Sequence, residues 1–268
     1  SLYAGRVSAV ACSPTDPNRY YIGGADGGVW RTLNGGISWT PLTDHMPCSA
    51  IGAVALDPTN HGVVYVGTGE ANFANHSRYG VGIYKSTDGG ATWAHLAEPT
   101  FAGRCISRIV IDPQNTQVLY ASVTIAGGFP SLAAAKMHPQ RLGPLGVFKS
   151  VDGGSSWTHL TSGLPAVSAT DLVMNPATPS ILYAGIGHIF GDAANGVYKS
   201  VNGGADWTKL TAGLPTQTSG RVTLGMSRSS GSALSARRTD QPSRCGIMTS
   251  RVMTKGLRRR ASASPSSA

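Results

Sequence analysis

Acidic side chains are scarce in this sequence. Only 13 of its 268 residues are Asp or Glu, and Glu70 and Glu98 are the only glutamates, which leaves few candidates for acid–base chemistry. Long apolar runs and a charged-then-apolar leader are also missing, so we expect no membrane span. The sequence opens on Ser1 rather than Met, which is typical of a mature product or of a piece excised from a longer chain.

Cysteine is rare too, and its spacing carries no signal. The four cysteines, Cys12, Cys48, Cys105 and Cys245, form no C-x-x-C pair of the kind that binds metal or exchanges disulfides. We therefore expect no metal and no cofactor. Buried free thiols are the favoured interpretation for the first three, with a disulfide among them as the alternative.

Positive charge is concentrated at the C-terminal end. From Ser227 onward the chain carries nine Lys or Arg and one acid, which is +8 of the net +9. This shift predicts a repeat domain over residues 1–226 and a basic, Ser/Arg-rich tail over residues 227–268. The tail has the composition of a disordered segment able to contact nucleic acid or anionic lipid. The alternative, which we favour, is an aberrant end produced by a reading-frame error or a truncated gene.

One eight-residue motif occurs four times, at residues 32–39, 86–93, 150–157 and 200–207. Each copy has a hydroxyl residue, Asp or Asn two positions on, a Gly pair, and Trp seven positions after the hydroxyl. Glycine suits a tight hairpin, an Asp or Asn oxygen can accept hydrogen bonds from backbone N–H groups two residues on, and Trp can bury its ring between sheets. The structural positions are Thr32, Asn34, Gly36, Trp39, Ser86, Asp88, Gly90, Trp93, Ser150, Asp152, Gly154, Trp157, Ser200, Asn202, Gly204 and Trp207.

Short β-type segments surround each motif in a fixed order. An apolar strand ends at Ser-Pro, Asp-Pro or Asn-Pro, a Tyr-containing strand follows, and two more strands flank the motif. This predicts units of four antiparallel strands, A to D, recurring about every 50 to 65 residues. A fifth unit begins with strands over residues 221–226 and 232–236 and then loses the pattern.

The motif S/T-x-D/N-G-G-x-x-W resembles the Asp-box, or BNR repeat, of sialidase-like, sortilin-like and xyloglucanase β-propellers. The wider pattern is similar to large bacterial WD40/YVTN/BNR-like repeat proteins. The resemblance implies an all-β propeller with four four-stranded blades and the start of a fifth, incomplete or part of a larger propeller. It also implies an extracellular or cell-envelope location, with further blades or domains in the parent chain.

The loops between strands B and C are the predicted binding face. They share one face of the disc with the D-to-A links, opposite the Asp-boxes, and in units 2 to 4 they are long and rich in aromatic, amide and charged residues. We expect a glycan or a protein or peptide ligand there, and no nucleic acid on the propeller. The candidate binding residues are Glu70, Asn72, Phe73, His76, Arg78, Tyr79, Phe129, His138, Arg141, His188 and Phe190.

Asp26 is the one candidate catalytic residue. Residues 20–31 resemble the first-blade segment of xyloglucanases, in which an Asp before Gly-Gly, an apolar residue, an aromatic and Arg is a catalytic carboxylate. Glycoside hydrolysis usually needs two carboxylates, and in that family the second comes from another propeller. We therefore expect a non-catalytic scaffold or binding module. The alternative is a fragment of a glycoside hydrolase, xyloglucanase-like rather than sialidase-like, because no Tyr and Glu can be assigned to sialidase chemistry.

Arg108 and Asp171 occupy the same strand-A position in adjacent units. We expect them to meet near the central channel as a structural ion pair.

Overall fold

A computed structural model of the chain describes residues 5–72, 77–126, 143–187, 191–212, 220–226 and 234–239, the last of these by backbone alone. These residues form four four-stranded antiparallel sheets and one two-stranded sheet. The single helix among them is the short α1 (Glu98–Phe101). No helix in the described residues is long and apolar enough to cross a membrane.

Strand order in each four-stranded sheet follows the chain. The first sheet is β1 (Val7–Cys12), β2 (Tyr20–Gly24), β3 (Val29–Thr32) and β4 (Thr40–Pro41). The second is β5 (Ile51–Leu56), β6 (Val64–Thr68), β7 (Ile83–Ser86) and β8 (Ala94–Leu96). The third is β9 (Cys105–Ile111), β10 (Leu119–Thr124), β11 (Gly146–Ser150) and β12 (Thr158–Leu160). The fourth is β13 (Ala169–Met174), β14 (Leu182–Ile186), β15 (Gly196–Ser200) and β16 (Thr208–Lys209), and β17 (Arg221–Met226) pairs with β18 (Leu234–Thr239).

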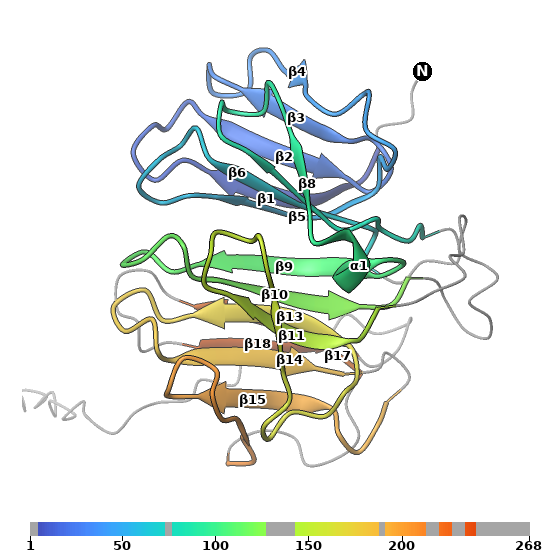
Figure 1. Cartoon of the computed structure of the whole chain (residues 1–268), viewed down its shortest axis with the longest axis vertical. Helices are drawn as coiled ribbons and strands as arrows, with labels where there is room; N and C mark the ends of the chain where they lie inside the picture. Colours follow the sequence, from blue (N-terminus) through green and yellow to red (C-terminus); the bar gives the residue numbers. More distant parts are fainter. Residues whose placement is uncertain are drawn as a thin grey trace, which may run out of the picture.

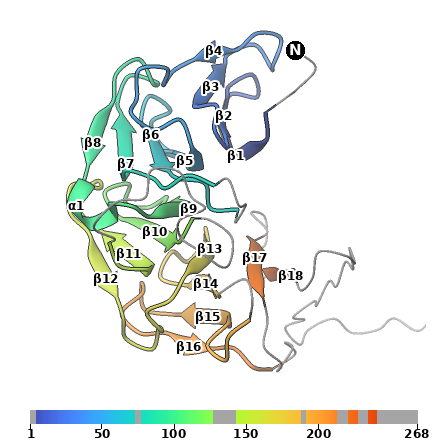
Figure 2. The same cartoon turned by 90° about the vertical axis from the view of Figure 1, so that its right-hand side faces the viewer.

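The sheets are stacked one after another (Figure 1) and fan around an axis (Figure 2). Their first strands, β1, β5, β9, β13 and β17, contact one another in sequence at the inner side, while β4, β8, β12 and β16 lie outermost. The prediction of a propeller with four blades and the start of a fifth is therefore confirmed. The fifth unit's second strand runs to Thr239, beyond the predicted end at residue 236. The predicted tail lies otherwise outside the described residues.

Hydroxyl side chains connect the inner strands. Ser107 Oγ donates to the carbonyl of Ala169 in the next blade at 2.7 Å, and Thr170 Oγ1 donates to Val222 at 2.7 Å. Ser8 makes the same kind of contact from blade 1 to Ile51. The strand register shifts at each of these hydroxyl residues, as in a β-bulge that re-aims one side chain.

Gly52 occupies this bulge position in the second blade. A Cβ at Gly52 would lie 2.2 Å from the carbonyl oxygen of Ile106 and 2.4 Å from that of Gly69. The backbones of blades 2 and 3 therefore approach too closely for any side chain there.

The repeated motif forms a fastened hairpin, which we call the Gly-Gly turn. In the third blade, Ser150 Oγ accepts from Gly154 N at 2.9 Å, and Asp152 Oδ1 accepts from Ser156 N at 2.9 Å. The sequence predicted that the Asp or Asn oxygen accepts from the backbone N–H two residues on, and this was wrong. It accepts instead from the backbone N–H four residues on. The reason is that Gly153 and Gly154 have positive φ angles of 68° and 92° and turn the chain back under the carboxylate. The same bonds recur at Asn34, Asp88 and Asn202.

The motif tryptophans pack against the preceding blade to different extents. The Trp157 ring stands edge-on to Phe101, with centroids 5.4 Å apart. Trp207 is only 5% exposed, whereas Trp39 of the first blade is 37% exposed. The predicted burial between sheets is thus confirmed for Trp207, whereas Trp93 and Trp157 are only partly buried against the preceding blade.

The three described cysteines are free thiols. Cys48 and Cys105 are buried as expected, but Cys12 is exposed because it lies on the same uncovered face of β1 as Val10, which is 57% exposed. Burial raises the pKa of both Cys48 and Cys105. Cys245 lies outside the described residues.

Candidate functional site

Asp26 lies in the turn between β2 and β3, on the face built by the B–C loops and the D–A links. Its Oδ2 is 3.0 Å from an Arg78 guanidinium nitrogen, and its Oδ1 accepts from Ser49 Oγ at 2.8 Å. Arg78 belongs to the B–C loop of the next blade, and Ser49 belongs to the link before β5. The two kinds of connection therefore do share one face. The Asp26 side chain remains 49% exposed, so its carboxylate is held in place and open to solvent.

Glu70, which follows β6, is a buried carboxylate. Its side chain is only 2% exposed, pairs with the Arg6 guanidinium, and accepts from Ser77 Oγ at 2.8 Å. Its backbone N–H also donates to the carbonyl of Arg78 at 3.0 Å. A buried charge needs such compensation to persist in a fold, so these contacts fit a structural anchor of the loop.

Tyr79 and Asn72 also have interior roles. Tyr79 is buried in a cluster with Ala71, Cys105 and Ala126, and this burial raises its pKa. Asn72 Oδ1 accepts from Arg221 at 2.7 Å. The structure thus brings Asp26, Glu70 and Arg78 together around one loop but places Glu70 and Tyr79 under the surface rather than on it.

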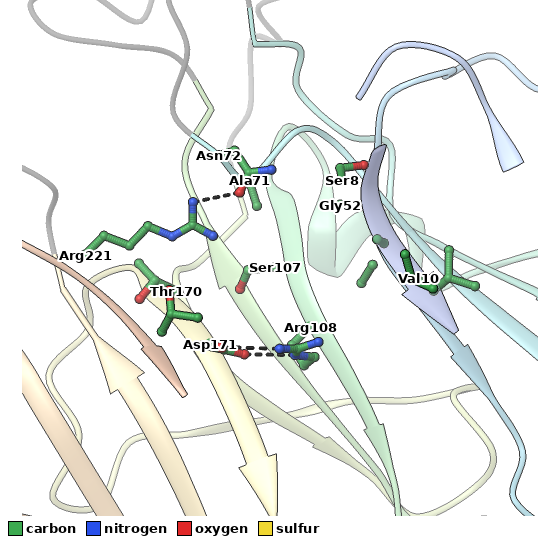
Figure 3. A pocket seen from close by; sticks show the side chains of 14 residues that line it. Ser8, Val10, Gly52, Ala71, Asn72, Ser107, Arg108, Thr170, Asp171 and Arg221 are labelled. Carbon is green, nitrogen blue, oxygen red and sulfur yellow. Dashed lines mark hydrogen bonds and ion pairs between the residues drawn. The ribbon is translucent and has the colours of Figure 1, made fainter. Parts of the chain in front are cut away.

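A cavity of about 200 Å³ opens along the inner strands. Its lining comes from β1, β5, β9, β13 and β17 together with Ala71 and Asn72. Figure 3 shows Arg108 and Asp171 facing each other across it. Arg108 Nε lies 2.8 Å from Asp171 Oδ1, and a second nitrogen lies 3.3 Å from Oδ2. The predicted ion pair is confirmed and is bidentate.

Arg221 enters the same cavity from the start of β17 (Figure 3). Burial lowers its pKa, an effect opposed by the negative charges of Asp171 and Glu70. The channel therefore contains the Arg221 guanidinium, which donates to Asn72 through one nitrogen while its buried Nε has no acceptor among the described residues.

Several sequence-predicted binding residues lie outside the described residues and receive no placement: Phe73, His76, Phe129, His138, Arg141, His188 and Phe190. Within the described part of the chain, no three His, Cys, Asp or Glu side chains are grouped as metal ligands. Sequence reasoning did not identify the partners Ser49, Ser77 and Arg6. Only Arg6 left a signal, because a Gly-Arg pair also precedes β9 and begins β17.

The described part of this face can hold polar ligands by ordinary hydrogen bonding. Asp26 is an acceptor, Arg78 is a donor 31% exposed, and both have fixed positions because they bind each other. Glycoside hydrolysis would need a second carboxylate on the opposite side of a bound sugar. Glu70, in its buried ion pair with Arg6, is not free to take that role.

Known proteins resemble this chain at low sequence identity. No protein-family profile matches it. A xyloglucanase from Hypocrea jecorina is 28% identical over 170 residues, covering 59% of this chain and 18% of that protein. A xyloglucanase from Paenibacillus sp. is 25% identical over 182 residues, covering 57% and 16%.

Solved structures resemble nearly the whole chain. The GH74 enzyme of Niastella koreensis superimposes with a TM-score of 0.62 at 24% identity, covering 88% of this chain and 33% of that one. The GH74 xyloglucanase of Xanthomonas campestris gives a TM-score of 0.63 at 20% identity, covering 90% and 35%. This chain therefore shares the β-propeller fold of these GH74 structures. The propeller described here spans less than a fifth of the length of the two curated relatives and about a third of these solved chains.

Proposed function

We propose that this chain is the glycan-binding part of a xyloglucanase-like glycoside hydrolase, and that Asp26 is one of the two catalytic carboxylates of the parent enzyme. The observation that carries the proposal is the state of Asp26. Its carboxylate is fixed by Arg78 and Ser49 and is still half exposed on the loop face. A catalytic carboxylate needs both a fixed position and access to substrate.

Hydrolysis is not expected from this chain alone. The mechanism requires an acid and a base or nucleophile on either side of the scissile bond. The resemblance to xyloglucanases assigns the second carboxylate to another propeller. The isolated chain is therefore expected to bind a β-glucan chain without cleaving it.

Xyloglucan oligosaccharides test the proposal directly. Isothermal titration should show saturable binding to the full chain, with no release of reducing sugar. Asp26→Asn should weaken binding by about tenfold, the effect of losing one charge-assisted hydrogen bond of about 1.4 kcal/mol. Asp16→Asn is the matched control, because Asp16 is a surface aspartate, 39% exposed, that also lies beside an arginine, Arg19, but in the turn between β1 and β2.

Asp26 also determines the outcome in the parent enzyme. There, Asp26→Asn should abolish xyloglucan hydrolysis while the protein stays folded. Retained hydrolysis in the parent, or equal oligosaccharide binding by the Asp26 and Asp16 variants, would exclude the role assigned to Asp26.

A non-catalytic scaffold for a protein or peptide ligand is the second candidate. It is favoured by the pairing of Asp26, Glu70 and Asp171 with Arg78, Arg6 and Arg108, since three carboxylates in ion pairs suit a rigid frame. This function predicts no glycan binding by the folded chain and capture of a peptide on the B–C face. An extracellular or cell-envelope location is part of both proposals.

A further inference from the structure

A closed cycle of contacts leads from Asp26 through the first two blades and back to Asp26. Its first contact is the ion pair between Asp26 Oδ2 and the Arg78 guanidinium, at 3.0 Å. The carbonyl of Arg78 accepts from the backbone N–H of Glu70 at 3.0 Å, and the Glu70 carboxylate pairs with the Arg6 guanidinium. The carbonyl of Arg6 accepts from the backbone N–H of Ala25 at 2.9 Å, and Ala25 directly precedes Asp26. We call these five residues the contact cycle.

The contact cycle joins two segments of the first blade to one loop of the second. Ala25 and Asp26 lie in the turn between β2 and β3, and Arg6 directly precedes β1. Glu70 and Arg78 lie in the loop between β6 and β7. The turn that carries the Asp26 carboxylate is therefore held from two sides. Arg78 binds its side chain, and Arg6 binds its backbone one residue earlier.

Glu70 is the buried member of the contact cycle. Its side chain is 2% exposed, against 45% for Arg6 and 49% for Asp26. Water cannot replace the partners of a buried carboxylate, so these partners are held firmly. Its second oxygen accepts from Ser77 Oγ at 2.8 Å, while its backbone N–H binds Arg78. One residue thus fixes two consecutive residues of the loop, the second of which reaches Asp26.

Two buried thiols support the same part of the loop more weakly. Cys105 Sγ donates to the Arg78 carbonyl at 3.5 Å, and Cys48 Sγ donates to the Tyr79 carbonyl at 3.6 Å. A thiol is a weak hydrogen-bond donor. The charged and backbone contacts of Glu70 are therefore the stronger restraints on the position of Arg78.

We propose that Glu70 and Arg6 are the positioning pair of the Asp26 site. Their ion pair locks the loop of the second blade onto the start of the first, and this sets the position of the Asp26 carboxylate through Arg78 and Ala25. Its consequence for glycan binding rests on the proposed function. The geometric part does not, because it concerns only the turn that carries Asp26 and the loop that carries Arg78.

Hydrogen exchange tests the geometric part without any glycan. Glu70→Gln keeps the size of the side chain but removes the charge that holds Arg6. In the full chain, NMR-detected exchange of the backbone amides of residues 25 and 70 should become about tenfold faster, because the local opening that exposes them costs less. The amide of Gly153, which is hydrogen-bonded in a turn of the third blade, should exchange at an unchanged rate.

A second set of variants approaches the pair from its other side. Arg6→Gln should accelerate exchange at the same two amides, whereas Arg6→Lys keeps a cation beside Glu70 and should retain most of the protection. Glu98→Gln is the matched control, because Glu98 is the other glutamate of the sequence and is 71% exposed. Thermal melts confirm that each variant is folded. If Glu70→Gln does not fold, the comparison of Arg6→Gln with Arg6→Lys decides in the same way.

Isothermal titration with xyloglucan oligosaccharides separates positioning from a general loss of structure. Glu70→Gln should weaken binding by about fivefold in the otherwise unmodified chain. In a chain that already carries Asp26→Asn it should have no further effect, because the pair acts through the Asp26 carboxylate. Losses that multiply in the double variant would show that Glu70 acts independently of Asp26 and would overturn the proposal.

Unchanged exchange at residues 25 and 70 in both Glu70→Gln and Arg6→Gln would also overturn the positioning pair, whatever the titrations show. A folded, unmodified chain that binds no oligosaccharide would contradict the proposed function instead. The exchange rates alone would then confirm or overturn the positioning pair.

Discussion

The carboxylate of Asp171 accepts a hydrogen bond from the backbone N–H of Leu224 at 2.8 Å. Asp171 belongs to the fourth blade and Leu224 to the first strand of the fifth. The same carboxylate pairs with Arg108 of the third blade and accepts from its own neighbour Leu172 at 2.9 Å. One buried side chain therefore connects three consecutive blades at the channel.

Replacing Asp171 should destabilise the chain strongly. Asp171→Ala leaves the buried Leu172 and Leu224 N–H groups without an acceptor and Arg108 without its partner. The expected loss is about 2–4 kcal/mol in the free energy of unfolding, measured by urea titration. Asp16→Ala, at a half-exposed surface aspartate, should change it by less than about 0.5 kcal/mol. Equal effects of the two substitutions would contradict this role.

Gly52 should not tolerate even a methyl group. Gly52→Ala places Cβ within 2.4 Å of two carbonyl oxygens, so blades 2 and 3 must separate, at a cost of about 2–3 kcal/mol. Gly225→Ala is the control, because Gly225 also lies on a first strand and a Cβ there meets nothing within 4 Å. Urea titrations of the two variants should differ clearly, and similar midpoints would show that the blades can separate freely.

The two Asp-containing Gly-Gly turns should make stability sensitive to acid. Hydrogen bonds from Ser156 and Ser150 lower the pKa of Asp152 from 3.8 to about 2, and bonds from Thr92 and Ser86 lower that of Asp88. Because the folded-state values are depressed, the stabilisation is present above pH 3.8 and is lost as the pH falls toward about 2.

Asparagine at these positions should remove that sensitivity. Asn34 and Asn202 show that the amide oxygen makes the same turn bond. The double variant Asp88→Asn, Asp152→Asn should therefore have a melting temperature that changes less between pH 4 and pH 2 than that of the unmodified chain. If scanning calorimetry showed the same fall in melting temperature between pH 4 and pH 2 for the double variant and the unmodified chain, this interpretation would be wrong.

The hydroxyl of Tyr120 should stabilise the chain, whereas that of Tyr183 should not. Tyr120→Phe removes a donor to Gly203 and should lower the free energy of unfolding by about 1 kcal/mol, since Lys149 still binds that carbonyl. Tyr183→Phe, the same change at the equivalent, partly buried tyrosine on the second strand of the fourth blade, should lie within about 0.5 kcal/mol of the unmodified chain. Comparable losses in a urea titration would mean that Tyr183 already has a partner.

The strand order and the turns could be predicted because their signals are local. Each motif contains its own glycines, hydroxyl and Asp or Asn, and the strands carry β-branched and aromatic residues between turn residues. The Arg108–Asp171 pair was accessible for a related reason. Because the blades repeat regularly, equivalent positions of adjacent first strands lie side by side. Aligning the repeats was therefore enough to predict that Arg108 and Asp171 meet.

Contacts that break the repeat could not be predicted. Glu70 and its partner Arg6 are 64 positions apart and lie in non-equivalent segments. The burial of Tyr79 depends on a loop folding back over Cys105, and the exposure of Cys12 depends on which face of β1 is covered. The closeness at Gly52 is likewise a property of two backbones rather than of the residue sequence.

The contacts between each Gly-Gly turn and the blade before it give the stack of blades a polarity. At each of the three junctions between blades 1 and 4, a tyrosine and a cation of the earlier blade donate to a glycine carbonyl of the later blade. Such a junction is heterologous, since neither surface can bind a copy of itself. Growth of the ring therefore has a direction, like that of a filament with two unlike ends, and a blade inserted backwards would face donors with donors.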